Sequence, residues 1–225
     1  RERIPNCQVR KVSIADGGEG TVDALVETLN GDYVEARVAD PLGRPIVARY
    51  GVIDGGTTAV MEMSAASGLP LIAPEERNPL LTSTYGTGEM IAHAMERGCR
   101  KFLVGIGGSA TNDGGTGMLR ALGFRFLDAE GRELVGGGEI LERIAQIDSS
   151  NARKELGECE FVVACDVTNP LYGPEGAAYV FAPQKGADAK MVEELDCGLR
   201  IFADVVKSHN GQDVAALQGA GAAGG

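Results

Sequence analysis

The polar residues that could carry out chemistry are concentrated in glycine-rich loops. The densest loop, GIGGSATNDGGTG at residues 105–117, places three neutral hydrogen-bonding side chains and one carboxylate between pairs of glycines. These side chains belong to Ser109, Thr111, Asn112 and Asp113. Together they could hold hydroxyls, a phosphate group and a metal-bound water. The alternative is that Asn112 or Asp113 caps the helix that follows, and the two roles are compatible.

Further loops of similar type are DGGEGT at residues 16–21, TYGTGE at residues 84–89 and DVTNP at residues 166–170. Glycines let backbone N–H groups approach an anion, and the start of a following helix favours negative charge. In open α/β sheets, ligands bind beyond the carboxyl ends of the strands. Several such loops in one chain therefore indicate an anionic or phosphorylated ligand, although any one of them alone is explained as well by a tight turn.

Two charged residues outside the densest loop suit phosphoryl transfer. Asp166 follows the apolar run FVVAC, where a carboxylate can deprotonate a substrate hydroxyl or hold Mg²⁺. The alternative role for Asp166 is to cap a turn. Lys185, within PQKGA, can pair with a phosphate or a substrate carboxylate, or it can be an ordinary surface lysine.

Several other catalytic signatures are absent from the sequence. There is no Gly-Lys dipeptide, and hence no P-loop, and there is no GxSxG or HExxH motif. We interpret the two histidines, His93 and His209, as ordinary surface or core residues. The five cysteines form no CxxC pair, so we expect reduced thiols rather than disulfides or a zinc site.

The densest loop also satisfies the dinucleotide-binding fingerprint in form. Gly105-x-Gly107-x-x-Ala110 follows a predicted strand, and Asp128 closes the next strand about 20 residues on. A nicotinamide-dependent oxidoreductase is therefore one alternative. Against it, residues 112–115 (NDGG) delay the helix, which should begin at the second glycine of such a fingerprint.

Composition and charge narrow the class of protein. The chain has 225 residues, 44% of them hydrophobic and 24% charged, which is typical of an ordinary globular protein. Its net charge of −11 provides no basic surface for a nucleic acid or an anionic membrane. No stretch is apolar enough to span a membrane, and residues 1–20 contain no signal-peptide core. We therefore expect a cytoplasmic protein without a nucleic-acid or membrane partner.

Hydrophobic periodicity predicts an α/β fold in which strands and helices alternate. Residues 33–63 have the pattern of a small antiparallel meander, and the helix after residue 20 has Thr21 as its predicted N-cap. Strands are predicted at 7–15, 33–38, 46–53, 58–63, 101–106, 124–127 and 161–165, of which 101–106 and 161–165 are of the buried type. Helices are predicted at 21–30, 87–97, 116–122, 138–147 and 189–207.

Taken together, six motifs in order along the chain resemble the bacterial glycerate kinase family of the type that forms glycerate 2-phosphate. These motifs are ADGGEGT at residues 15–21, DPLG at 40–43, the loop at 105–117, CDVTNPL at 165–171, PQKGA at 183–187 and GAGAAGG at 219–225. The resemblance implies ATP- and Mg²⁺-dependent phosphorylation of D-glycerate to 2-phosphoglycerate, in the catabolism of glucarate, galactarate or glyoxylate. It is compatible with a monomer or a homodimer.

The resemblance also implies a two-lobed α/β architecture. Residues 1–40 would belong to a flavodoxin-like parallel-sheet lobe that is only partly present, residues 41–218 to an inserted mixed-sheet α/β lobe, and residues 219–225 to the start of the return to the first lobe. The family's opening strand and its C-terminal portion have no counterpart in this sequence. We therefore expect this chain to be a segment that needs further residues for turnover.

Carried onto this chain, the resemblance implies that Asp166 and Asp113 are catalytic and that Asp16 and Asp113 hold Mg²⁺. The expected mechanism has Asp166 deprotonating the glycerate 2-hydroxyl while glycine-loop N–H groups and Lys185 stabilise the transferred phosphoryl group. The residues expected to bind substrate or phosphate are Asp16, Gly17, Gly18, Glu19, Gly107, Gly108, Ser109, Thr111, Asn112, Asn169 and Lys185. A non-catalytic lobe that binds a sugar acid is the remaining alternative.

Overall fold

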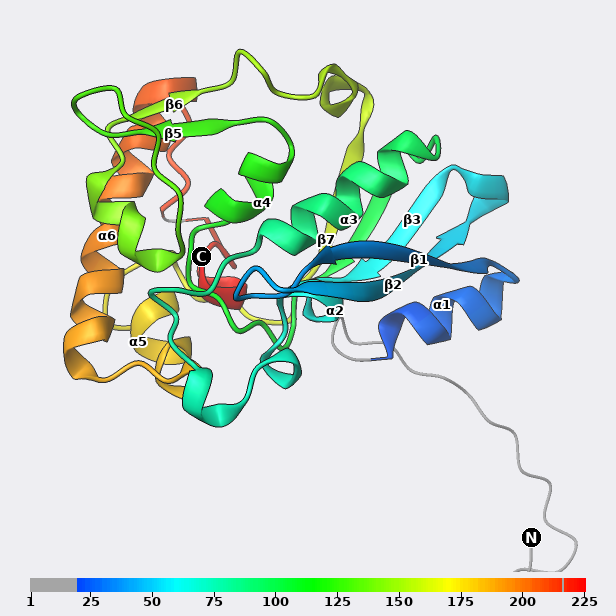
Figure 1. Ribbon diagram of the computed structural model, residues 1–225, viewed down its shortest axis with the longest axis horizontal. Coiled ribbons are helices and arrows are strands. Elements are labelled where there is room, and N and C mark those ends of the chain that lie inside the picture. Colours follow the sequence, from blue (N-terminus) through cyan, green and yellow to red (C-terminus); the bar gives the residue numbers. More distant parts are fainter. Residues whose placement is uncertain (1–19, 216) are drawn as a thin grey trace, which may run out of the picture.

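A five-stranded mixed sheet forms the centre of the molecule. The computed structural model describes residues 20–215 and 217–225. The strand order is β1-β2-β3-β4-β7, and a separate two-stranded sheet contains β5 and β6 (Figure 1). The prediction of an α/β fold with an early antiparallel section is confirmed, whereas the predicted strand at residues 7–15 lies outside the described residues.

The direction of the strands changes halfway across the sheet. Strands β1 (Asp32–Ala39), β2 (Pro45–Ile53) and β3 (Thr58–Glu62) form the predicted antiparallel meander. Strands β4 (Lys101–Gly105) and β7 (Glu160–Ala164) then continue parallel to β3. The carboxyl ends of β3, β4 and β7 therefore meet at one edge, from which their loops emerge together.

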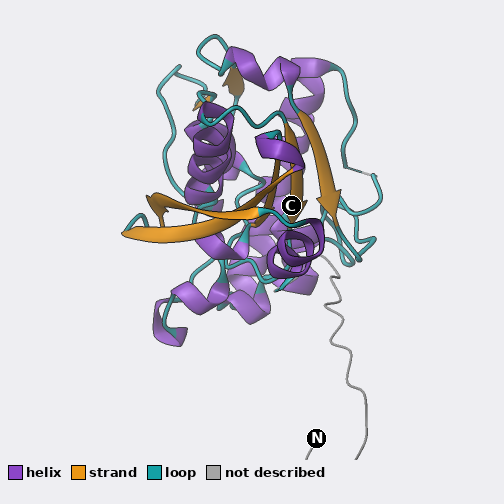
Figure 2. Ribbon diagram, turned by 90° about the vertical axis from the view of Figure 1, so that its right-hand side faces the viewer, coloured by secondary structure: helices purple, strands orange, loops and turns teal. Residues whose placement is uncertain are grey.

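Helices cover both faces of the sheet, which is strongly twisted (Figure 2). Helix α3 (Tyr85–Glu96) packs on one face, where Met90 and Ile91 join Tyr50 and Met61 in a buried core. Helix α1 (Thr21–Leu29) packs on the other face through Val22 and Val26. Since side chains alternate along a strand, β3 supplies Met61 to the first core, under α3, and Val60 to the small cluster under α1.

A second core lies beside the sheet and is built around the long helix α6 (Ala189–Asn210). Leu195, Leu199 and Phe202 of α6 are buried against Leu141 and Phe126. The other elements of this half are α4 (Thr116–Ala121), β5 (Arg125–Leu127), β6 (Gln146–Asp148) and α5 (Ala177–Phe181), while the short helix α2 (Ser64–Ser67) follows β3. The predicted helix at 189–207 is confirmed and runs three residues further.

The helix predicted over residues 138–147 is wrong. Residues Gly138–Arg143 form a short 3₁₀ helix, and Gln146–Asp148 form strand β6. The apolar spacing of Ile140, Leu141, Ile144 and Ile147 satisfied a helical pattern, but the Ala145 N–H donates to the Leu127 carbonyl and β6 pairs with β5. Pairing between distant segments therefore overrode the local periodicity.

Two further expectations require correction. Strand β7 is not buried, because it lies at the edge of the sheet, and Phe161, Val162 and Val163 are 40%, 47% and 54% exposed. Thr21 is the first residue of α1 rather than its N-cap, and the cap position belongs to Gly20 at φ +94°. The left-handed backbone there favours glycine.

The predicted lobe boundary near residue 40 falls between β1 and β2, which pair over their whole length, so the sheet continues across it. The division of the chain into lobes stays a prediction.

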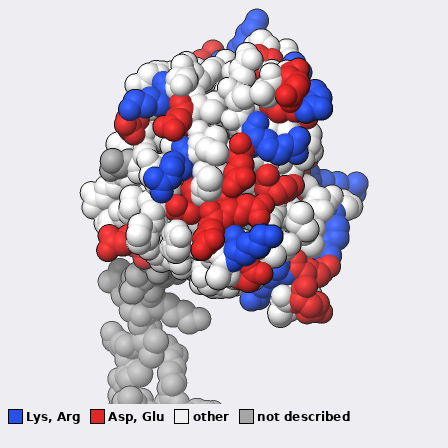
Figure 3. Space-filling view, turned by 90° about the vertical axis from the view of Figure 1, so that its left-hand side faces the viewer, with Lys and Arg blue, Asp and Glu red and all other residues white. Residues whose placement is uncertain are grey.

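The surface reflects the acidic composition. Asp and Glu side chains gather near the middle of the face to which α6 belongs (Figure 3). Cys99, Cys159, Cys165 and Cys197 are free thiols, as expected, and Cys7 lies outside the described residues. Within the described ranges, no helix is long and apolar enough to cross a membrane.

The close packing of α3 on α4 gives a test of the fold. A Cβ on Gly88 would overlap the Met118 carbonyl oxygen and lie 2.7 Å from the Ala121 Cβ. We expect Gly88→Ala to lower the free energy of unfolding by about 1–3 kcal/mol, because the main chain of α4 must move. Gly157→Ala is the control, since a Cβ there has no neighbour within 4 Å. Equal stability of the two variants in chemical denaturation would contradict this packing.

Candidate functional site

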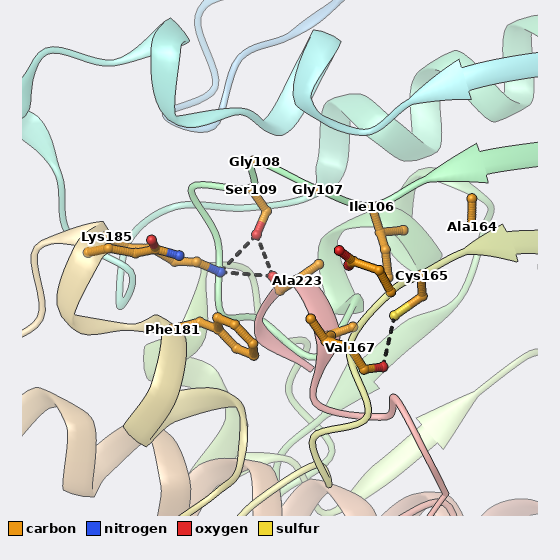
Figure 4. Close-up of a pocket in the computed structure, with 13 residues that line it drawn as sticks. Ile106, Gly107, Gly108, Ser109, Ala164, Cys165, Val167, Phe181, Lys185 and Ala223 are labelled. Carbon is orange, nitrogen blue, oxygen red and sulfur yellow. Dashed lines mark hydrogen bonds between the residues drawn. The ribbon is translucent and has the colours of Figure 1, made fainter. Parts of the chain in front are cut away.

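A small pocket of about 190 Å³ opens where the loops after β4 and β7 leave the sheet. The loop after β4 contributes Ile106 to Ser109, and the loop after β7 contributes Cys165 to Val167. The other walls come from Ala164, Phe181, Gln184, Lys185, Ala222 and Ala223 (Figure 4). The sequence prediction of a ligand site beyond the carboxyl ends of strands thus coincides with a pocket.

The glycine loop after β4 is hydrogen-bonded to residues 67–69, whereas several of its N–H groups have no partner among the described residues. The Gly108 carbonyl accepts the Leu69 N–H at 3.0 Å, and the Ala110 N–H donates to the Ser67 carbonyl at 2.8 Å. In contrast, the N–H groups of Gly107, Gly108 and Ser109 have no acceptor among the described residues. Successive free N–H groups of this kind form an anion-binding concavity. Gly108 adopts φ +73°, a conformation that favours glycine.

Lys185 is buried, with only 1% of its surface exposed, and it joins three segments of the chain. Its ammonium donates to Ser109 Oγ at 2.8 Å, to the Thr111 carbonyl at 2.5 Å and to the Ala223 carbonyl at 2.9 Å. Ser109 Oγ also donates to the Ala223 carbonyl. Figure 4 shows the Lys185 side chain extending toward Ser109 and Ala223. Burial lowers the pKa of Lys185 to about 7.

Asp166 stands where two cavities meet. It lines the small pocket and also a larger cavity of about 700 Å³, whose walls include Leu119, Val163, Leu171 and Phe202. Its side chain is exposed, and its carboxylate makes no hydrogen bond or ion pair within the described part of the chain. A carboxylate without protein partners is free to accept a proton from a ligand.

Asp113 differs sharply from Asp166. It is only 1% exposed, and its Oδ2 accepts hydrogen bonds from the Thr84 N–H (2.8 Å), the Thr84 hydroxyl (2.9 Å) and the Gly117 N–H (3.2 Å). Its Oδ1 accepts the Gly115 N–H at 3.1 Å. Burial raises the pKa of Asp113, and the hydrogen bonds from Thr84 oppose this shift.

This environment argues against the catalytic and Mg²⁺-binding roles predicted for Asp113. Both oxygens are already occupied, and Asp113 does not line the small pocket. Between residues 20 and 225, apart from 216, no group of three or more His, Cys, Asp or Glu residues is arranged to hold a metal ion. The alternative N-cap role predicted for Asn112 or Asp113 is also wrong, because the N-cap of α4 is Gly115. Asp113 instead orders the start of α4 by accepting the Gly115 and Gly117 N–H groups.

The remaining predicted residues separate into distinct groups. Gly107, Gly108, Ser109 and Lys185 line the small pocket together with Asp166. Thr111 is buried and contributes its carbonyl to Lys185, while the Asn169 amide donates to the Glu175 carbonyl at 2.7 Å. Asn112 is fully buried, and neither polar atom of its side chain has a partner among the described residues. Asp16, Gly17, Gly18 and Glu19 lie outside these residues.

Sequence reasoning missed the contribution of Ala222 and Ala223. Ala223 adopts φ +58°, which is unusual for a residue with a Cβ, and its carbonyl receives hydrogen bonds from both Lys185 and Ser109. The run at residues 219–225 carried part of the family resemblance. The residue types in this run could not predict the contact with Lys185, because Ala223 accepts through its main-chain carbonyl, which every residue has.

The dinucleotide alternative is wrong. In a dinucleotide-binding unit, the strand that ends at the acidic residue belongs to the same parallel sheet as the first strand. Here β5, which precedes Asp128, pairs antiparallel with β6 in the separate sheet. The carboxylate of Asp128 is also occupied, because it accepts the Glu130 and Arg132 N–H groups and pairs with the Arg132 guanidinium.

The contrast between the two aspartates is testable by stability measurements. In Asp113→Asn, an NH₂ group replaces one of the two oxygens that accept from Thr84, Gly115 and Gly117, so at least one buried donor loses its acceptor. We therefore expect the free energy of unfolding to fall by about 1–3 kcal/mol. Asp166→Asn, in contrast, should leave the melting temperature unchanged, because the Asp166 carboxylate has no protein partner in the described ranges. Comparable destabilisation of both variants would refute the assignment.

The lowered pKa of Lys185 predicts that the free energy of unfolding depends on pH. Its pKa falls from an ordinary 10.5 to about 7 on folding, so above pH 7 the unfolded chain binds more protons than the folded chain. The free energy of unfolding should therefore rise from pH 7.5 to 9.5, by at most about 1.4 kcal/mol per pH unit from this group. The Lys185→Met substitution removes this contribution, so the free energy of unfolding of the variant should rise less steeply over the same pH range. Identical slopes for the two proteins would show that Lys185 stays charged in the fold.

Comparison with known proteins shows the family to which this chain is similar. The family model described as "Glycerate kinase family" matches residues 1–225. The chain is 50% identical over 222 residues to the glycerate kinase of Bacillus subtilis (strain 168), covering 99% of this chain and 58% of the relative. It is 48% identical over 225 residues to the glycerate 2-kinase of Escherichia coli (strain K12), covering 100% of this chain and 59% of the relative.

A solved structure from Salmonella typhimurium LT2 that carries the name glycerate kinase 2 matches with a TM-score of 0.92 and 49% identity. The match covers 100% of this chain and 60% of that one. The chain thus spans about three fifths of the length of these relatives. Since the family model covers every residue and the identities approach one half, this chain belongs to the glycerate kinase family.

Proposed function

We propose that this chain carries the catalytic groups for phosphorylation of D-glycerate by ATP, with 2-phosphoglycerate and ADP as products. The observation that carries the proposal is the unpartnered carboxylate of Asp166, which faces the same pocket as the free N–H groups of Gly107, Gly108 and Ser109. A proton acceptor beside an anion-binding loop is the pair of functions that phosphoryl transfer to a hydroxyl requires.

The sizes of the two cavities support an arrangement of the substrates. The small pocket, at about 190 Å³, is below the roughly 300–1,000 Å³ of pockets that enclose drug-sized ligands, and it suits a three-carbon acid. The larger, more apolar cavity shares Ile106, Cys165, Asp166 and Val167 with it. We place glycerate in the small pocket and the phosphoryl donor on the side of the larger cavity, so that Asp166 lies between them.

In this mechanism Asp166 accepts the proton of the glycerate 2-hydroxyl, and the oxygen of that hydroxyl attacks the terminal phosphorus of ATP. The bond from that phosphorus to the bridging oxygen breaks, and the electron pair leaves with ADP. Preorganised donors aimed at the developing charge need no reorganisation during the reaction. The N–H groups of Gly107, Gly108 and Ser109 are such donors. The hydrogen bonds of Lys185 go to protein oxygens, so its role here is to position Ser109 and Ala223 behind the loop.

Mg²⁺ belongs to the proposal as the ion that accompanies ATP. When bound, it neutralises charge on the transferred phosphoryl group. Mg²⁺ is usually held by one or two carboxylates together with substrate phosphates, so a site without a cluster of three protein carboxylates is compatible with it. Because Asp166 is assigned to the proton of the hydroxyl, the predicted Mg²⁺ ligand that remains is Asp16, which lies outside the described residues.

Replacing Asp166 tests the proposal. In the full-length protein that contains this sequence, we expect Asp166→Asn to lower kcat by about 10²–10⁴-fold, the usual contribution of a general base. Formation of ADP and of 2-phosphoglycerate would be measured with D-glycerate, ATP and Mg²⁺. Asp204→Asn, at an exposed aspartate on α6, is the matched control and should retain full activity.

Full turnover by Asp166→Asn would refute the role of Asp166. A wild-type protein that binds D-glycerate but forms no ADP would instead indicate a non-catalytic binding lobe. Formation of 3-phosphoglycerate would refute the choice of hydroxyl.

A further inference from the structure

A third cavity, of about 450 Å³, lies apart from the small pocket and the larger cavity and shares no residue with either. Its walls come from the β1–β2 turn, the start of α3, Arg120 of α4, and Val135 and Gly136. The turn contains the sequence DPLG at residues 40–43, one of the motifs of the family resemblance that the proposed function leaves without a role. The volume is within the range of pockets that bind small molecules.

Arg120 is the charged group of this cavity that has no partner of opposite charge among residues 20–215 and 217–225. Its Nε is buried and has no hydrogen-bond partner, and its guanidinium forms no ion pair with any described residue. Its one contact of note is with the ring of Tyr85, whose centroid lies 5.5 Å from the guanidinium carbon. The terminal nitrogens of the guanidinium also make no hydrogen bond to a described residue, so a carboxylate ligand that accepts from them gains a charge-assisted pair.

The two carboxylates that line the cavity are already engaged. Asp40 Oδ1 accepts the N–H groups of Leu42 and Arg44, and its Oδ2 accepts from the Arg44 guanidinium at 2.6 Å. Glu89 Oε2 accepts the Ala39 N–H at 2.6 Å. Arg120 therefore remains the group free to bind a charged ligand, and the ligand must be an anion. A second negative charge would be repelled by Asp40 and Glu89, so a monoanion fits better than a phosphate.

Apolar side chains at the mouth of the cavity define the rest of the ligand. Leu81 is 56% exposed and Val135 is 65% exposed, and both line this cavity. Isolated exposed apolar residues are common, but here two of them line the same cavity as a guanidinium that lies over an aromatic ring and has no ion pair with a described residue. An apolar body next to a carboxylate would cover these side chains and remove their surface from water.

We propose that this cavity is a binding site for a monocarboxylic acid with an apolar body, whose carboxylate pairs with Arg120 and whose body contacts Leu81, Tyr85 and Val135. The site is coupled to the glycine loop through Asp113. Ser83 and Tyr85 line the cavity, and the intervening Thr84 donates twice to the Asp113 carboxylate. The helix that carries Arg120 begins three residues after Asp113.

Titration of the full chain with benzoate, followed by amide chemical shifts, tests the site without any need for turnover. We expect saturable shifts at residues 81–85 and 118–121, and weaker binding of benzyl alcohol, which has the ring without the carboxylate. Arg120→Gln is expected to weaken benzoate binding at least tenfold, as is typical of the loss of a charge-assisted pair. Arg37→Gln, at an exposed arginine on β1, is the matched control and should bind as wild type does.

Val135→Asp provides an independent variant, because it adds a negative charge at an exposed position without disturbing the core. It should also weaken benzoate binding. Equal affinity of wild type, Arg120→Gln and Val135→Asp would overturn the proposal. So would an absence of saturable shifts, or shifts confined to residues 106–109 and 165–167, which would place the carboxylate in the proposed glycerate pocket.

Hydrogen exchange tests the coupling. The Thr84 and Gly117 amides donate to Asp113, and ligand at ten times its Kd is expected to slow their exchange by up to about tenfold if local opening empties the cavity. Unchanged exchange at both amides under saturating benzoate would overturn the coupling.

Discussion

The buried carboxylate of Asp113 connects the two halves of this molecule. One oxygen accepts from Thr84, which precedes α3 and the first core, and from Gly117 at the start of α4, which leads into the second core. A buried carboxylate is costly unless donors surround it, and here five hydrogen bonds come from Ser83, Thr84, Gly115 and Gly117. Because these donors belong to separate segments, satisfying Asp113 also sets how the glycine loop leaves the sheet.

Lys185 fixes the glycine loop at Ser109 and Thr111, as Asp113 fixes it at Gly115 and Gly117. Its ammonium is removed from water and reaches three oxygens that belong to residues 109, 111 and 223. The result is a loop whose Ser109 hydroxyl and Thr111 carbonyl are engaged by Lys185, while the N–H groups of residues 107–109 have no partner among the described residues. Preorganised dipoles of this kind are the main means by which enzymes stabilise developing charge.

The mixed sheet explains why the two cavities are separate. The parallel strands β3, β4 and β7 bring their loops to one edge, where the proposed catalytic pocket lies. The antiparallel β1–β2 ribbon instead places its turn against α3 and α4, where the cavity of Arg120 lies. Asp113 lies between the two regions, since its loop continues into α4 on one side and contacts the residues before α3 on the other.

The sequence by itself determined the α/β class, the antiparallel meander, the helix at 189–207 and the placement of Gly107, Gly108, Ser109 and Asp166 in loops after strands. These follow from periodicity and turn chemistry, which are local. Only the tertiary structure decided that β7 is an edge strand, that residues 146–148 pair with β5, and that Asp113 is saturated by hydrogen bonds while Asp166 is free. The physical reason is that burial and hydrogen-bond satisfaction depend on partners such as Thr84 and Ala223, which lie 29 and 38 residues from Asp113 and Lys185 in the sequence.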